Sequence, residues 1–179
     1  MSSHEIVLPQ TKPETEWVRG RALQKTGGTY LHSSAQARFA AALRAWAASG
    51  RGRVAPSWRF RVAPPGKVIR PLVPDVGYLS FEAVPLGAPH EAVQVPEKAP
   101  TVAVEVLCED DLEADIDDKI TTYLDAGSAA VIIVDPDSNS IQVHDRDGSR
   151  SFQIGQTLTH PALPGFALDV RRYFDDIKQ

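Results

Sequence analysis

The chain has 179 residues, of which 42% are hydrophobic, and a formal net charge of -4 at pH 7. A chain of this size is most simply one domain, which would bury about 70% of its unfolded surface. The single cysteine, Cys108, excludes an internal disulfide and a cysteine-based zinc cluster. The first residues have no signal-peptide pattern, and the longest apolar run, Ala129 to Val134, is too short to span a bilayer. We therefore expect a soluble, cytoplasmic protein.

The charge is divided unevenly along the chain. Residues 1–70 contain 12 Lys/Arg and 3 Asp/Glu, a balance of +9, whereas residues 71–179 contain 7 and 20, a balance of -13. This asymmetry is compatible with a basic phosphate-facing surface beside an acidic metal-binding one. It is equally compatible with two halves that complement each other within one fold.

The first elements are a short strand or hairpin and a helix. Residues 16–24 predict the strand or hairpin, and the helix follows, with Ser33 or Ser34 as its N-cap and Gly50 as its stop. Three large apolar side chains repeat at helical spacing inside it: Phe39, Leu43 and Trp46. His32 lies just before this helix and is either a capping or surface residue or a residue of the functional site.

Residues 53–62 alternate between apolar and basic side chains. Trp58, Phe60 and Val62 alternate with Arg59 and Arg61, which predicts a half-buried strand with its arginines facing outward. The two arginines either contact the phosphates of a nucleic acid or form an ordinary solvated face. The pattern alone leaves both interpretations open.

Two carboxylates lie within apolar strands. Asp75 lies near the start of a strand predicted over Val73 to Phe81, and Glu105 lies inside the strand predicted over Thr101 to Leu107. A carboxylate on a buried strand is costly unless it has a partner, so both positions indicate chemistry. Between the two strands, residues 82–100 contain four prolines and no clean period, which predicts a long loop.

A helix is predicted from about Asp111 to Ala126. One side of it is apolar, with four residues at helical spacing: Leu112, Ile116, Ile120 and Leu124. Asp115, Lys119 and Tyr123 follow one another at i, i+4 and i+8 along its flank. Lys119 can therefore lean towards the sheet, or it can form an exposed pair with Asp115 that stabilises the helix by about 0.3 kcal/mol.

The last third of the chain predicts three further elements. Residues 128–135 form a buried strand, so that strand, helix and strand make a right-handed crossover in which the strands of Glu105 and Val131 are parallel. Residues 140–144 and 151–154 flank an Asp-Gly turn and predict a hairpin. The turn, residues 145–148, resembles a fragment of a calcium loop, but the downstream ligands are missing and a plain turn is favoured. A short helix over residues 170–177 closes the chain.

These pieces together resemble the Uma-two family, a branch of the PD-(D/E)XK nuclease superfamily with restriction-endonuclease-like members. The resemblance covers roughly residues 16–174. It rests on the following segments and, more weakly, on His32: Pro74-Asp75-Val76; Val104-Glu105-Val106-Leu107; the helix with Asp115, Lys119 and Tyr123 that leads to Gly127; Val134-Asp135-Pro136; and Leu163-Pro164-Gly165-Phe166.

The resemblance implies an α/β fold, with one mixed sheet flanked by helices, a C-terminal hairpin and a single domain over residues 1–179. It implies that Asp75, Glu105 and Lys119 are catalytic, with the lysine moved onto the helix because Leu107 stands at its usual place. Asp75 and Glu105, together with the Val106 carbonyl, would hold Mg²⁺ or Mn²⁺. The metal would also offset the mutual repulsion of the two carboxylates.

The residue types suit phosphodiester hydrolysis. This reaction needs an activated water, relief of the charge that builds on the phosphoryl oxygens, and a stabilised leaving oxygen. Lys119 would orient the attacking water or offset charge in the transition state. DNA is the expected partner, with His32, Arg59 and Arg61 as candidate contacts. A twofold dimer would cut both strands, since each chain carries one site.

One segment departs from the family pattern and keeps other functions open. Where the family continues with Ser-Pro-Ser or similar, this chain has residues 108–111, Cys-Glu-Asp-Asp, whose acids would repel a phosphate backbone. Cys108 itself is expected to be a small buried filler, since no histidine is placed to activate it. Besides a DNA endonuclease, the alternatives are a catalytically inactive binding or assembly protein on the nuclease fold and a nuclease that acts on RNA or on single strands.

Overall fold

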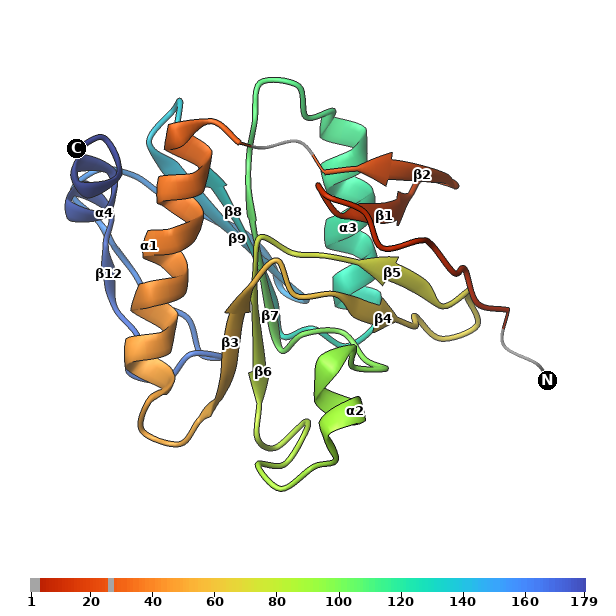
Figure 1. Ribbon diagram of the computed structural model, residues 1–179. Helices are drawn as coiled ribbons and strands as arrows, with labels where there is room; N and C mark the ends of the chain where they lie inside the picture. Colours follow the sequence, from red (N-terminus) through yellow and green to blue (C-terminus); the bar gives the residue numbers. More distant parts are fainter. Residues whose placement is uncertain (1–3, 26–27) are drawn as a thin grey trace.

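The computed structural model describes residues 4–25 and 28–179, and these contain a six-stranded mixed sheet. From one edge to the other its strands are β10 (Gly148–Phe152), β9 (Ser140–Asp145), β8 (Ala130–Asp135), β7 (Val102–Val106), β6 (Val76–Ser80) and β3 (Gly52–Pro56). The helices are α1 (Tyr30–Ala47), α2 (His90–Gln94), α3 (Glu113–Asp125) and α4 (Val170–Ile177). Figure 1 shows α1 and α4 on one side of the sheet and α3 on the other. The expected α/β class is confirmed.

Three two-stranded sheets accompany the central sheet within the described ranges. They pair β1 (Thr15–Val18) with β2 (Arg21–Gln24), β4 (Phe60–Val62) with β5 (Arg70–Leu72), and β11 (Thr157–Leu158) with β12 (Leu168–Asp169). The β1–β2 pair confirms the hairpin predicted for residues 16–24. It packs against β5 and against α3, which places the N-terminal segment beside the C-terminal half of the chain.

The predicted crossover and C-terminal hairpin are both present. Strands β7 and β8 run parallel, with Glu105 opposite Ile133, and α3 connects them. The Asp-Gly turn joins β9 to β10, which confirms the predicted hairpin. Helix α4 has the predicted bounds.

Strand β7 separates two cores because successive side chains of a strand point to opposite faces. Val102, Val104 and Val106 belong to the core that α1 and α4 cover, and Ala103 belongs to the core that α3 covers. All five residues of the strand are buried. The alternation therefore directs Glu105 towards α3, into the side of the sheet where the functional site lies.

Helix α1 begins earlier than the sequence pattern predicts. Its N-cap is Thr29, whose hydroxyl accepts a hydrogen bond from the His32 amide at 3.3 Å, and not Ser33 or Ser34. His32 therefore lies in the first turn of the helix and not before it. Threonine is also a favourable N-cap, and a start at this position turns His32 and Ala35 to the buried face.

The prediction of a single strand over residues 53–62 is wrong, because the chain turns in the middle of this segment. Strand β3 ends at Pro56, and Ser57 adopts a left-handed φ of 48°. The chain then enters β4 in a separate sheet, in which Phe60 and Val62 are fully buried. Proline has no amide to continue the ladder, and the positive φ redirects the backbone.

Two further boundaries differ from the prediction. The strand expected over residues 73–81 is β6, which begins only at Val76, so Asp75 immediately precedes the strand and does not lie within it. Residues 70–72 form β5. The loop expected over residues 82–100 contains the five-residue helix α2.

The buried face of α3 includes its polar flank as well as most of the predicted apolar stripe, since Ile116, Ile120 and Leu124 pack in the core beneath the helix. Leu112 is 56% exposed, whereas Asp115 and Lys119 are each 5% exposed and Tyr123 is fully buried. Ile120 is buried as expected. The polar flank of the helix faces the protein because the hairpin and the sheet provide charged partners for it.

The exposed Asp115–Lys119 pair is absent, because each residue has other partners. Asp115 pairs with Arg21 at 2.6 Å and with Arg19 at 3.4 Å. Arg70 pairs with Asp118 at 2.8 Å, and Lys67 pairs with Asp125 at 2.7 Å. The basic first half of the chain thus binds the acidic face of α3, which supports the interpretation that the two halves complement each other.

Candidate active site

The two carboxylates expected at the site lie side by side. Strand β6 pairs antiparallel with β7, with Val76 opposite Val104, so the residue before β6, Asp75, lies next to Glu105. Asp75 is 2% exposed and Glu105 is 3% exposed. The Val106 amide donates a 2.7 Å hydrogen bond to Asp75 Oδ2, which holds that oxygen of the carboxylate in place.

Lys119 reaches the same point from α3. Its Nζ lies 2.7 Å from Glu105 Oε2 and 3.0 Å from Glu16 Oε2. Asp75, Glu105 and Lys119 all line a cavity of about 120 Å³, together with Val106 and His32. The structure therefore brings together the three residues predicted to be catalytic. Their catalytic roles stay predictions.

The sequence patterns did not single out three charged residues that line this cavity, Glu16 and Arg21 of the hairpin and Lys25 directly after it. Glu16 on β1 accepts a 2.7 Å hydrogen bond from the Val73 amide through Oε1 and pairs with Lys119 through Oε2. Lys25, directly after β2, places its Nζ 3.0 Å from Asp75 Oδ1 and 3.3 Å from Glu105 Oε2. The signal that singled out Glu105, a carboxylate on the buried face of a strand, applies to Glu16 as well, but its four-residue strand is too short to show clearly which side is buried. No comparable signal marks Lys25.

Tyr123 completes the polar contacts of Glu105. Its hydroxyl donates a hydrogen bond to Glu105 Oε1 at 3.2 Å, and its ring is fully buried in the core beneath α3. Burial raises the pKa of the Tyr123 hydroxyl well above its usual value, and the charge of Glu105 raises it further. Tyr123 is therefore a neutral donor that orients Glu105.

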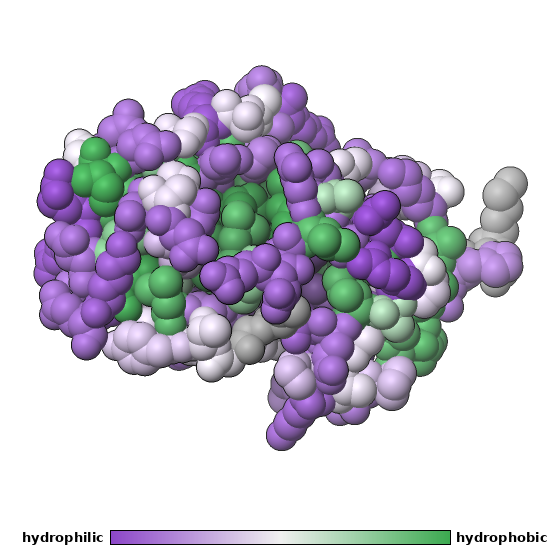
Figure 2. Space-filling model, turned by 90° about the horizontal axis from the view of Figure 1, so that it is seen from above, coloured by the Kyte–Doolittle hydropathy of each residue, from purple (hydrophilic) through white to green (hydrophobic). Residues whose placement is uncertain are grey.

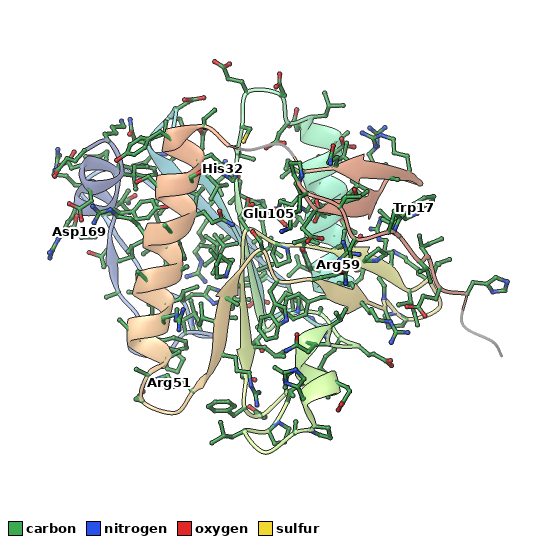
Figure 3. The ribbon with its side chains drawn as sticks, viewed as in Figure 1. Trp17, His32, Arg51, Arg59, Glu105 and Asp169 are labelled. Carbon is green, nitrogen blue, oxygen red and sulfur yellow. The ribbon has the colours of Figure 1, made fainter. Side chains whose placement is uncertain are left out.

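His32 belongs to the cavity, whereas the two predicted arginine contacts do not line it. His32 Nε2 lies 3.5 Å from Asp75 Oδ2. Arg59 forms an ion pair with Glu14, and Arg61 forms ion pairs with Glu5 and Glu97. Figure 3 shows His32 and Glu105 near the centre of the molecule and Arg59 on the side of the small β4–β5 sheet. The carboxylate partners of Arg59 and Arg61 compete with any phosphate for these guanidinium groups.

The two central carboxylates have opposite pKa shifts. Burial alone would raise the pKa of Asp75, but the charge of Lys25 and a hydrogen bond from His32 outweigh burial, and the pKa is well below its usual value. The pKa of Glu105 is raised, because burial and the charges of Glu16 and Asp75 outweigh the attraction of the two lysines. Neighbouring acids with divergent pKa values are typical of functional sites.

The donor atoms of the cavity suit a hard cation. Asp75 Oδ1, Glu105 Oε2 and the Val73 carbonyl oxygen converge on one point, which the Lys25 ammonium holds. Carboxylate and carbonyl oxygens are the ligands that Mg²⁺ prefers. Among residues 4–25 and 28–179, no group of three or more His, Cys, Asp or Glu is arranged to hold a metal ion. Any ion would therefore rely on these two carboxylates and on peptide oxygens.

The structure of a "putative nuclease belonging to DUF820" from Anabaena variabilis superposes with a TM-score of 0.83 at 19% sequence identity, covering 95% of this chain and 94% of that chain. The two proteins thus share the same α/β fold. The sequence matches the Uma2 family, described as "Putative restriction endonuclease", over residues 4–171. The chain belongs to the Uma2 family, which confirms the resemblance.

No curated protein sequence matches this chain. Within the described part of the chain, helices long and apolar enough for a membrane span are absent. Figure 2 looks down on the end of the sheet at which α1 and α3 begin, and the side chains visible there are mainly hydrophilic.

Proposed function

We propose that this protein is a Mg²⁺- or Mn²⁺-dependent endonuclease that hydrolyses phosphodiester bonds of DNA. Membership in the Uma2 family supports the nuclease class. The observation that carries the proposal is the position of Lys119, whose Nζ lies 2.7 Å from Glu105 Oε2 in the cavity that Asp75 also lines. Two buried carboxylates and a buried amine in one cavity form the acid and lysine set that this reaction requires.

Asp75 and Glu105 would hold the metal ion, with the Val106 carbonyl as the third protein ligand that the family resemblance implies. A bound Mg²⁺ supplies charge for the phosphoryl oxygens and lowers the pKa of a bound water. The Val106 amide and His32 hold Asp75, while Tyr123 holds Glu105, so both carboxylates are oriented before any ligand arrives. Such preorganisation makes metal binding and catalysis efficient.

Lys119 would position the attacking water or neutralise charge in the transition state. Its amine is held between Glu105 and Glu16 at 2.7 and 3.0 Å, and its side chain is 6% exposed. A cation in a desolvated cavity interacts more strongly with a developing negative charge than an exposed one. Lys119 therefore has the place and the burial that this role requires.

A plasmid-nicking assay with Mg²⁺ or Mn²⁺ tests the proposal. We expect nicking by the wild-type protein and a loss of about 100-fold in rate for Lys119→Ala, the order of magnitude for losing one electrostatic stabiliser. Lys67→Ala is the matched control, because Lys67 is exposed and pairs with Asp125 on the outer side of the same helix. Absence of nicking, or nicking that Lys119→Ala leaves unchanged, would contradict the proposal.

A second candidate is a catalytically inactive binding or assembly protein on this fold. Two observations favour it: Asp110 and Asp111 line the same cavity, where they would repel a phosphate, and the Lys25 ammonium lies between the two central carboxylates. Calorimetry that finds no divalent-ion binding dependent on Asp75 and Glu105 would favour this candidate over the nuclease.

The substrate and the assembly state have their own tests. A panel of duplex DNA, single-stranded DNA and RNA distinguishes a DNA endonuclease from the alternative, a nuclease for RNA or single strands. Light scattering with and without duplex DNA tests the proposed dimer. A dimer would place two sites on one duplex, one for each strand.

A further inference from the structure

Lys25 is coordinated in the way that a metal ion would be. Its Nζ lies 2.7 Å from the Val73 carbonyl oxygen, 3.0 Å from Asp75 Oδ1 and 3.3 Å from Glu105 Oε2. An ammonium group has three donors, and here each of them has an oxygen partner from a different residue. Resting on the function proposed above, we propose that the Lys25 ammonium occupies the divalent-cation position, and that an ion enters only when this side chain withdraws.

The charge balance of the cavity supports an exchange of one cation for the other. Three carboxylates (Glu16, Asp75 and Glu105) and two ammonium groups (Lys25 and Lys119) contact one another here. With both amines in place the group has one net negative charge. A divalent ion added beside Lys25 would make the buried group net positive, whereas an ion that replaces Lys25 makes it neutral. Buried charge is tolerated best when it is balanced, so replacement is favoured over addition.

The structure also offers the side chain a place to go. The backbone of Lys25 is fixed, because its amide donates a 2.8 Å hydrogen bond to the Glu14 carbonyl. The side chain of Lys25 is 12% exposed and lines two spaces. One is the cavity of about 120 Å³ that Asp75 and Glu105 line, called the acid cavity here, and the other is a neighbouring hollow of about 290 Å³ that Glu14 lines. A rotation about the side-chain bonds of Lys25 would move the ammonium away from Asp75 into this hollow, beside Glu14, whose carboxylate also pairs with Arg59.

Lys119 does not share this freedom. It extends from the middle of α3, contacts Glu16 and Glu105, and lines only the acid cavity among the cavities described. The two lysines of the site are therefore distinct. Lys119 is a fixed amine that stays in the cavity, and Lys25 is the cation that competes with the metal.

The first test measures Mn²⁺ binding by calorimetry. We expect Lys25→Met, which keeps the length of the side chain and removes its charge, to lower the Kd for Mn²⁺ by about tenfold or more, because the competing ammonium is gone. Lys67→Met is the matched control and should leave the Kd unchanged, since Lys67 pairs with Asp125 outside the cavity. Combining Lys25→Met with Asp75→Asn should abolish the gain, which would locate the ion at this cavity.

The second test uses the wild-type protein and does not depend on a variant that folds. Amine acetylation followed by mass spectrometry reports how accessible each lysine is. We expect saturating Mn²⁺ to increase the labelling of Lys25 several-fold and to leave that of Lys67 unchanged. Labelling of Lys25 that stays constant or falls as the ion saturates the protein would overturn the inference.

The outcomes separate this inference from the proposed function. Equal Mn²⁺ affinity in the wild type and in Lys25→Met, or no binding in either, would overturn the inference. Tighter binding in Lys25→Met together with an absence of plasmid nicking would support the inference and count against the endonuclease. Nicking that requires Lys119 and is insensitive to Lys25→Met at all Mn²⁺ concentrations would support the endonuclease and count against the inference.

Discussion

The Nζ atom of Lys119 lies 2.7 Å from Oε2 of Glu105, which joins α3 to β7 through a buried ion pair. Because α3 follows β7 directly in the crossover, this contact fixes the helix against the strand at the level of the site. Replacing one partner of a buried pair leaves the other charge unpaired, which costs about 3–5 kcal/mol. The residues that would act on a substrate are thus also residues on which the fold depends.

Glu16 provides a test of how the lysine is positioned. We expect Glu16→Ala to lower the free energy of unfolding by about 1–3 kcal/mol, because the buried Val73 amide loses its acceptor. Glu16→Gln should cost less, since its amide oxygen can still accept that hydrogen bond. In the nicking assay, Glu16→Gln should reduce the rate by about tenfold, less than Lys119→Ala, because the amine loses only one of its two carboxylate partners.

Urea unfolding and the nicking assay check these two expectations. Asp176→Asn is a suitable control, because Asp176 on α4 pairs with Arg38 and does not line the acid cavity. Equal stability of Glu16→Ala and the wild type would contradict the assigned hydrogen bond. A rate for Glu16→Gln as low as that of Lys119→Ala would show that Glu16 does more than hold the lysine.

The two central carboxylates should be required for ion binding. Loss of a residue that only supports a metal ligand weakens metal binding by about 10- to 100-fold. We expect Asp75→Asn and Glu105→Gln each to weaken Mn²⁺ binding by more than that, because these carboxylates would contact the ion. Asp118→Asn is the control, since Asp118 pairs with Arg70 outside the cavity. Calorimetry supplies the measurement, and circular dichroism shows whether each variant is folded. Undiminished Mn²⁺ affinity in both folded variants would place the ion elsewhere.

Local sequence patterns predicted most of the central fold. Period-two and period-3.6 patterns identified β7, α3 and β8, and the Asp-Gly turn identified the β9–β10 hairpin. The predictions were wrong where contacts between distant segments determine the strand pairing or the orientation of a helix. Strand β4 leaves the central sheet to pair with β5. Helix α3 turns its charged flank inward because two residues of the β1–β2 hairpin, Arg21 and Glu16, pair with Asp115 and Lys119.

Part of the candidate site could be predicted from local sequence, and the rest depends on contacts between distant segments. Asp75, Glu105 and Lys119 belong to segments that the family resemblance covers, and Glu105 also stands out as a charge in a buried strand. Glu16 lies on a four-residue strand, which is too short for alternation to show clearly which side is buried. Lys25 follows that hairpin, and its role depends on the tertiary contact with Asp75, which its local sequence does not encode.

Gly77 tests how closely the small β4–β5 sheet packs beside the site. A Cβ atom at Gly77 would lie 2.8 Å from Phe60 Cε2, closer than side chains pack. We expect Gly77→Ala to lower the free energy of unfolding by about 1–3 kcal/mol through overpacking. Gly87→Ala is the control, because a Cβ there meets nothing within 4 Å. Urea unfolding of both variants checks the difference, and equal stabilities would mean that the Phe60 ring moves aside without cost.

Acid should remove the stability that Asp75 contributes. Its pKa in the folded protein lies below the ordinary value of 3.8, because the charge of Lys25 and the hydrogen bond from His32 outweigh the effect of burial. A group with a lowered folded pKa stabilises the protein above its unfolded pKa, and this contribution is lost as the pH falls through the folded pKa. The difference in the free energy of unfolding between wild type and Asp75→Asn should therefore be largest near neutral pH and shrink below about pH 4.

Urea titrations of wild type and Asp75→Asn across this pH range measure the difference. Taking the difference cancels the contributions of groups that titrate alike in both proteins. Glu105 is not one of these groups, because the charge of Asp75 is one cause of its raised pKa. Asp137→Asn, at an exposed position, should show no such dependence on pH. A difference between wild type and Asp75→Asn that stays constant from neutral pH to about pH 3 would mean that the Asp75 carboxylate is not preferentially ionised in the folded state, against the close contact with Lys25.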